Sequence, residues 1–228
     1  MRFVLWDIDG TLVDTAGHGG AAFADAFEVM FGRVPDGPVP MAGRTDHEIA
    51  LSILQLNRVD GGEAHLPGMW RELEAALARK QEAIRADGRA LPGAAQALEA
   101  LAGRTGVVQS LLTGNIEANA ATKLGAFGLD RWLDLEIGGY GSDGGVRSEL
   151  VAIALGRAEA KHGVQLSPRD AVLVGDTPLD VAAGRAAGAR VVAVASGFSS
   201  EDELRAAGPD AVLSDLRDTD ALLAAVLG

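Results

Sequence analysis

The stretch WDIDGTLVDT, residues 6–15, places three carboxylates around a Gly-Thr turn directly behind the apolar run at residues 3–6. Such a short and continuous apolar run is typical of a strand that is buried on both faces of a parallel sheet. Asp7 and Asp9 would then stand at the carboxyl end of a buried strand, where carboxylates repel one another unless a cation lies between them. The stretch therefore predicts a parallel sheet and a cation-binding site at the carboxyl ends of its strands.

Four more short apolar runs follow along the chain, at residues 107–112, 171–174, 191–195 and 211–213. Stretches rich in Ala, Leu and Glu that we expect to be helical accompany them, at residues 92–103, 116–126, 148–162, 178–188, 201–207 and 218–227. Strands that alternate with helices predict an α/β fold with a Rossmann-like parallel-sheet core. In such sheets ligands bind outside the carboxyl ends of the strands.

One long segment interrupts this alternation. Residues 15–90 contain no convincing strand and instead favour helices at residues 19–31, 46–57 and 68–87. We therefore expect an inserted helical cap domain at residues 15–90, mounted on a catalytic core formed by residues 1–14 and 91–228.

Composition excludes several classes of protein. A formal net charge of −12 makes nucleic acid an unfavourable partner. The chain has no cysteine, which excludes disulfides, zinc thiolates and a cysteine nucleophile. No run of about 18 apolar residues predicts a membrane span, and no signal peptide is recognisable, so we expect a cytoplasmic protein. A monomer and a homodimer are equally compatible with the sequence.

Polar residues follow the apolar runs at the points where the predicted strands end. LLTGN brings Thr113, Gly114 and Asn115 to the sheet edge, and VGDTPLD brings Asp176 and Asp180. Because parallel strands present their carboxyl ends on one edge, we expect these groups to converge with the first two aspartates. A few carboxylates suit Mg²⁺, which keeps waters and uses substrate phosphate as ligand, better than Ca²⁺.

The remaining groups at this edge suit a phosphate. Thr113 and the backbone N–H groups after it open a helix, which is a natural anion cradle. Arg147, in GGVRSEL, adds a cation at the start of another helix, although it could also be only a solvated charge. A free carboxylate can attack phosphorus to form an aspartyl phosphate, while a second acid serves as proton donor and acceptor.

The motifs DIDGTLVDT, LLTGN, VGDTPLD and LPGAAQALEALA together resemble the haloacid dehalogenase-like phosphohydrolases, in the helical-cap subgroup close to phosphoglycolate phosphatases. The resemblance covers essentially the whole chain. It implies that Asp7 is the nucleophile, that Asp9 is the acid/base, and that Thr113 binds the phosphoryl group with Gly114 and Asn115. It further implies that Asp7, the Asp9 carbonyl and Asp176 hold Mg²⁺. Asp180 would support these ligands without binding the metal itself. Where the family usually has a lysine, the best candidate here is Arg147.

Two predicted helix starts carry residues with competing roles. In MAGRTDHEI, Arg44 could bind an anionic tail of the substrate or be only a surface charge. Thr45 could be an N-cap that forms a capping box with Glu48. Asp180 could likewise complete a capping box with Thr177, and this role is compatible with support of the metal site.

Alternative functions are weighed against the phosphatase. GHGGAA, residues 17–22, matches a dinucleotide-binding pattern, but it does not follow a strand directly, which disfavours an oxidoreductase. Dehalogenases of the resembled fold use one aspartate and no metal, and a non-catalytic binding protein would be expected to lose an aspartate. Sugar phosphomutases keep both aspartates and often carry a histidine near the position of His18. We therefore expect a phosphatase for a small phosphorylated metabolite, with a sugar phosphomutase as the alternative.

Overall fold

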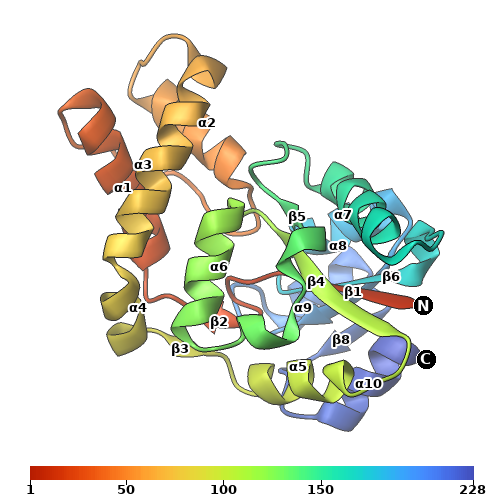
Figure 1. Ribbon diagram of the computed structural model, residues 1–228. Helices are drawn as coiled ribbons and strands as arrows, with labels where there is room; N and C mark the ends of the chain where they lie inside the picture. The colour runs from red at the N-terminus through yellow and green to blue at the C-terminus, as the bar shows by residue number, and fades with distance from the viewer.

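The computed structural model describes residues 1–228 and contains a six-stranded parallel sheet flanked by helices (Figure 1). The strands lie in the spatial order β5-β4-β1-β6-β7-β8, and every neighbouring pair is parallel. They are β1 (Arg2–Trp6), β4 (Val107–Thr113), β5 (Gly139–Tyr140), β6 (Ala171–Gly175), β7 (Arg190–Val194) and β8 (Ala211–Leu213). The predicted α/β class and all five predicted strands are confirmed. The sixth strand, β5, was not predicted, because two residues are too few to show a pattern.

The helices that accompany the sheet begin and end within two residues of the predicted positions. They are α5 (Ala94–Ala102), α6 (Glu117–Ala126), α7 (Arg147–His162), α8 (Pro178–Ala187), α9 (Glu201–Ala207) and α10 (Thr219–Leu227). Short 3₁₀ helices occur at Gly62–His65, Asp130–Trp132, Leu135–Ile137 and Pro168–Asp170. None of the helices is both long enough and apolar enough to cross a membrane.

The central strand β1 is buried on both faces. Val4 and Trp6 belong to the hydrophobic cluster that includes residues of α5, α6 and α10. Phe3 and Leu5 belong to a second cluster, formed mainly with α7. Two-sided burial explains why the apolar run at residues 3–6 is continuous rather than alternating.

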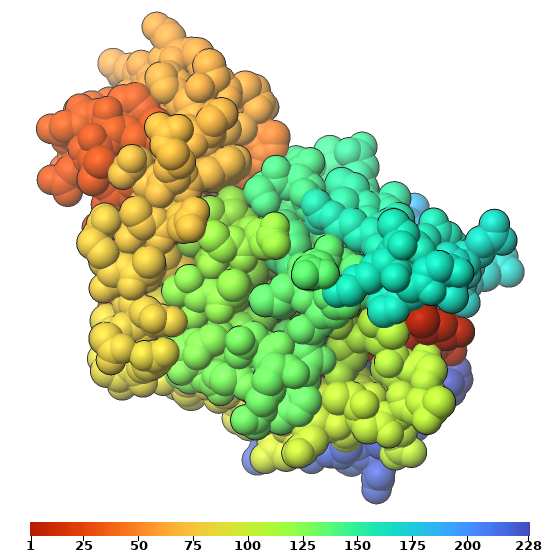
Figure 2. All heavy atoms as spheres, in the orientation of Figure 1, coloured from red at the N-terminus to blue at the C-terminus, as the bar shows by residue number.

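The helical block, residues 15–90, forms a lobe that lies against the segment containing α6 (Figure 2). Its helices are α1 (His18–Phe31), α2 (Asp46–Leu56), α3 (Leu66–Arg79) and α4 (Gln81–Asp87). They enclose a hydrophobic cluster of their own, which Ile116 joins from the start of α6. The prediction of one helix over residues 68–87 is wrong: at Lys80 the backbone N–H bonds to Leu77 O, only three residues back, and a separate helix follows.

A two-stranded ribbon connects the helical block to the sheet. β2 (Val13–Asp14) pairs antiparallel with β3 (Arg89–Ala90), so the chain leaves and returns at one place. The prediction that residues 15–90 lack a strand is wrong at this point, because the pairing is between residues far apart in sequence. A Cβ atom on Gly88 would lie 2.6 Å from Asp14 O, so only glycine permits this close return of the chain. The ribbon holds the block next to the carboxyl end of β1.

Candidate active site

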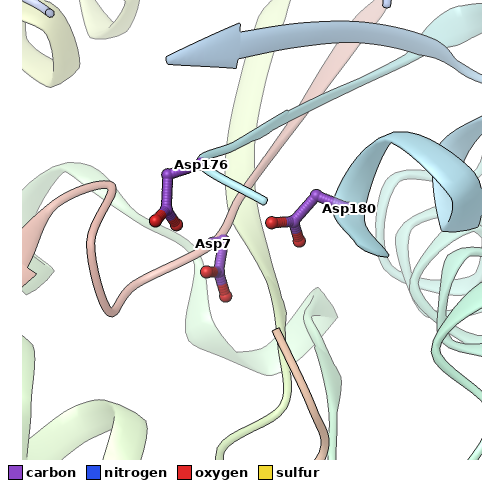
Figure 3. Close-up of side chains that lie close together, drawn as sticks. All are labelled: Asp7, Asp176 and Asp180. Atoms are coloured by element: carbon purple, nitrogen blue, oxygen red, sulfur yellow. The ribbon is translucent and has the colours of Figure 1, made fainter. Parts of the chain in front are cut away.

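Three buried carboxylates gather at the carboxyl edge of the sheet, as Figure 3 shows. Asp7 follows β1, Asp176 follows β6, and Asp180 lies in the first turn of α8. One ligand oxygen from each lies within 4.8 Å of the others. The convergence that the order of the motifs predicted is therefore present, and Asp180 is a full member of this carboxylate cluster.

Burial makes the carboxylate cluster electrostatically unfavourable by itself. Desolvation is the largest cause that raises the pKa of Asp7 to about 7, although the neighbouring guanidinium of Arg147 lowers it. Desolvation, followed by the charges of Asp7 and Asp180, raises the pKa of Asp176 to about 8. Three carboxylates in this environment favour the binding of a cation.

Arg147 supplies one such cation. It is the first residue of α7 and is 9% exposed, so the reading of this residue as a solvated charge is wrong. Its Nη2 atom lies 2.8 Å from Asp7 Oδ1 and 2.5 Å from Asp180 Oδ1. One guanidinium against three carboxylates still leaves an excess of negative charge. The donor set, composed only of carboxylate oxygens, therefore fits a hard divalent cation such as Mg²⁺.

The carboxylate of Asp176 contacts the turn at Gly10 and Thr11 in the first motif. Thr11 donates its hydroxyl to Asp176 Oδ1 at 3.2 Å, and the backbone N–H of Phe198 donates to Oδ2 at 2.8 Å. Gly10 has a φ of +84°, and a Cβ atom there would lie 2.3 Å from Asp176 Oδ2. The loop at Phe198 was not predicted; the only signal in the sequence was a segment rich in Gly and Ser directly after a predicted strand.

Asp180 forms the predicted capping box, whereas its predicted support of a metal site remains a prediction. Its Oδ2 atom accepts hydrogen bonds from the backbone N–H and the hydroxyl of Thr177, and its own N–H donates to that hydroxyl. The capping box is thus confirmed. Its other oxygen, Oδ1, points to Arg147 and the carboxylate cluster.

The carboxylate of Asp9 turns away from the carboxylate cluster toward α6. Lys123 Nζ lies 2.8 Å from Asp9 Oδ1 and 2.6 Å from Oδ2, and it donates to Asn115 Oδ1 at 2.6 Å. Asn115 Nδ2 in turn donates to Asp9 Oδ2 and to Thr113 Oγ1, both at 2.8 Å. The predicted acid/base and the predicted phosphate-binding turn are therefore joined in one hydrogen-bonded network.

No sequence pattern singled out Lys123. It is 5% exposed and lies on the face of α6 that also buries Ala120 and Leu124. The available signal was its position on the apolar face of a helix that begins at the predicted phosphate-binding turn. A buried ammonium rarely lacks a partner, so this position indicated an acidic group nearby.

The turn at Gly114 is the place where the helical block contacts the site. The backbone N–H of Asp46 donates to Gly114 O at 2.7 Å, and Asp46 Oδ2 accepts from the backbone N–H of Ile116 at 2.8 Å. A Cβ atom on Gly114 would lie 2.2 Å from Arg44 O, so glycine is required for this approach. Burial raises the pKa of Asp46 to about 7. Asp46 was also missed, since nothing local distinguishes it from an ordinary first-turn acid.

Arg44 directs its guanidinium along α2. Nη1 donates to Pro40 O at 3.0 Å, and Nη2 donates to Glu48 O at 3.2 Å and to Ser52 Oγ at 2.9 Å. The predicted capping box of Thr45 and Glu48 is present at the start of the same helix. The anion-binding role of Arg44 remains a prediction, and none of its three hydrogen-bond acceptors lines the cavity described next.

A cavity of about 430 Å³ opens between the sheet edge and the helical block. It brings together Asp7, Asp9, Thr113, Gly114, Asn115, Arg44 and Arg147 from the predicted site, with Lys123 and Asp46. His18 does not line it; its Nε2 atom lies 2.8 Å from Asp87 Oδ2 on α4. GHGGAA forms the start of α1 and follows the ribbon strand β2, not a strand of the parallel sheet.

Comparison with known proteins shows the family and the fold of this chain. Residues 4–185 match the family described as haloacid dehalogenase-like hydrolase. Phosphoglycolate phosphatase 1 of Pseudomonas aeruginosa is 33% identical over 221 residues, which cover 95% of this chain and 78% of that protein. A predicted phosphoglycolate phosphatase from Haemophilus somnus has a similar fold, with a TM-score of 0.70, 20% identity and 97% coverage of both chains. A protein from Thermotoga maritima that is proposed to be a beta-phosphoglucomutase matches with a TM-score of 0.58, 19% identity and coverage of 97% and 98%.

Proposed function

This chain belongs to the haloacid dehalogenase-like hydrolase family, and from that membership we propose that it is a Mg²⁺-dependent phosphatase of small phosphomonoesters. The observation that carries the proposal is the position of Asp7. Its carboxylate lies in the cavity, paired with Arg147 and next to the carboxylate cluster. A nucleophile for phosphorus and a cation for phosphoryl oxygens therefore stand side by side.

The proposed reaction proceeds in two steps. An oxygen of Asp7 attacks phosphorus, the bond from phosphorus to the ester oxygen breaks, and Asp9 gives its proton to the departing oxygen. Water then attacks the aspartyl phosphate, Asp9 takes the proton of that water, and phosphate leaves with Asp7 restored. Arg147 and Thr113 would bind the phosphoryl oxygens and stabilise the charge that develops on them.

The metal would be held by Asp7, Asp176 and the backbone carbonyl of Asp9, with Asp180 supporting them. When bound, Mg²⁺ offsets the repulsion within the carboxylate cluster and withdraws charge from the phosphoryl group. The excess of three buried carboxylates over one guanidinium supports this assignment.

We further propose that residues 15–90 act as a cap over a core of residues 1–14 and 91–228. The cavity lies between the two parts, and Asp46 of the block binds the turn at Gly114. A cap in this place would exclude water and select the ester. Cytoplasmic location, a small phosphorylated metabolite as substrate, and a monomeric or homodimeric state remain predictions.

A sugar phosphomutase remains the alternative function. The histidine that raised this alternative, His18, is paired with Asp87 and lies outside the cavity lining. The name of the Pseudomonas relative makes 2-phosphoglycolate the first ester to assay.

The proposal is tested by phosphate release from a panel of small phosphomonoesters, with Mg²⁺ or with a chelator. We expect release that requires Mg²⁺ in the wild type and disappears in Asp7→Asn, because the amide keeps the shape but is not a nucleophile. Asp202→Asn is the matched control, since the side chain of Asp202 is 99% exposed. Release that survives in Asp7→Asn would place the chemistry elsewhere.

A further inference from the structure

The part of the cavity beyond the phosphate site has an apolar wall. Phe23 and Ile49 come from the helical block, together with Met41 and the glycines that begin α1. A Cβ atom on Gly20 would lie 3.3 Å from Met41 Sδ, so the thioether lies close to the start of α1. Val13 and Leu91 continue the apolar lining near the ribbon. The departing group of a substrate would rest against these side chains.

The two buried cations of the cavity are already matched. Arg147 pairs with Asp7 and Asp180, and Lys123 pairs with both carboxylate oxygens of Asp9. Each is less than one-tenth exposed. The ammonium is therefore engaged by protein groups, and the guanidinium is engaged by Asp7, Asp180 and, in the proposed reaction, the phosphoryl group, so neither serves a second anionic group of the substrate.

The two other cations among the lining residues also have partners. Arg89, whose side chain is 65% exposed, pairs with Asp14 at 2.8 Å. The guanidinium of Arg44 donates to groups of Pro40, Glu48 and Ser52, none of which lines the cavity. Against these four cations the lining holds four carboxylates, those of Asp7, Asp9, Asp14 and Asp46. The lining thus holds equal numbers of acidic and basic side chains.

From this arrangement we infer that the ester's departing group is a neutral, partly apolar alcohol, and that the cavity discriminates against esters carrying a second anion such as a carboxylate. The inference rests on the proposed phosphatase function and narrows its substrate class. A carboxylate placed against Phe23, Met41 and Ile49 would lose its hydration without gaining a cation. A neutral group of the same shape would avoid that cost.

The test compares esters that differ only in this charge. 2-Phosphoglycolate and its amide are nearly equal in size, as are 4-carboxyphenyl phosphate and 4-carbamoylphenyl phosphate. We expect kcat/KM to be higher for the neutral member of each pair by about tenfold or more, because an unpaired buried group is rejected at least that strongly. An equal or higher kcat/KM for the carboxylate esters than for their amides would overturn the inference while leaving the phosphatase proposal intact. Hydrolysis of none of these esters would instead overturn the phosphatase proposal.

A matched pair of variants tests the physical cause. Met41 is only partly buried, so Met41→Lys can add an ammonium to the wall, and Met41→Gln adds polarity without charge. We expect Met41→Lys to raise the ratio of kcat/KM for the carboxylate ester to kcat/KM for its amide by about tenfold. Met41→Gln should keep the ratio of the wild type. Thermal unfolding of both variants verifies that they are folded. An unchanged ratio in folded Met41→Lys would show that charge in this wall does not set the preference.

Discussion

Arg147 Nη2 lies 2.8 Å from Asp7 Oδ1, and this ion pair is almost completely withdrawn from water. Where the resembled family usually has a lysine, this chain uses a guanidinium. Here one nitrogen of that guanidinium, Nη2, contacts Asp180 as well as Asp7. The cation at the candidate nucleophile is therefore also connected to the first turn of α8.

Replacing Arg147 tests this double contact. We expect Arg147→Lys to retain part of the activity and Arg147→Met to lose 100-fold or more, because only the first keeps a cation at the phosphate site. Arg147→Met should also lower the free energy of unfolding by about 3–5 kcal/mol, since it leaves buried carboxylates without their partner. Steady-state assays and urea unfolding measure both effects. Arg157→Lys, which alters a more exposed pair with Asp143, is the control; comparable losses there would argue against a special role for Arg147.

Lys123 should act through Asp9. In Lys123→Met the carboxylate of Asp9 loses the ammonium that contacts both of its oxygens. If Lys123 positions Asp9 to protonate the departing oxygen, the kcat for alkyl phosphates should fall by about tenfold more than the kcat for p-nitrophenyl phosphate, whose departing group needs little protonation. The ratio of kcat values for the two esters is the measurement. Lys161→Met removes an exposed pair with Asp134 and Glu136 and should leave that ratio unchanged. An equal loss for both esters in Lys123→Met would contradict the role.

Asp46 should make stability depend on pH. Burial raises its pKa from 3.8 to about 7, so the folded state holds this proton more tightly than the unfolded state does. Between these two values the group destabilises the folded protein increasingly as pH rises, by at most about 1.4 kcal/mol per pH unit. Asp46→Asn removes this titration and keeps an acceptor for Ile116. Urea unfolding at several pH values between 5 and 8 measures the free energy of unfolding of both proteins. The stability of the variant relative to the wild type should increase with pH up to about pH 7. A difference that does not vary with pH would refute the prediction.

Gly114 should be intolerant of any side chain. A Cβ atom there would lie 2.2 Å from the backbone oxygen of Arg44, so Gly114→Ala must displace either the phosphate-binding turn or the helical block. We expect a loss of activity of about 100-fold, because small misplacements of positioning groups cost that much. Gly125→Ala is the control, since a Cβ atom there meets no atom within 4 Å and alanine favours a helix. Full activity in Gly114→Ala would mean that activity does not depend on the close approach of the helical block to Gly114.

The sequence by itself determined the sheet and the location of the carboxylate cluster. Runs such as residues 3–6 are apolar throughout because strands inside a parallel sheet are buried on both faces. Asp7 and Asp176 were predicted to meet because the carboxyl ends of parallel strands share one edge, and β1 and β6 are indeed neighbours. The capping boxes at Thr45 and Thr177 were predictable for a different reason: they depend on residues three positions apart.

Only the tertiary structure decided how the remaining polar groups are paired. Lys123 and Asp9 are 114 residues apart, and Asp46 and Ile116 are 70 apart, so no local pattern connects them. These contacts depend on how the helical block packs against α6, which in turn depends on the ribbon between β2 and β3 and on glycines that permit close approach. The same packing directs Arg44 along α2 and gives the cavity lining equal numbers of acidic and basic side chains. Spacing along the chain specifies which strand end a side chain occupies, whereas its partner is specified by the packing of whole elements.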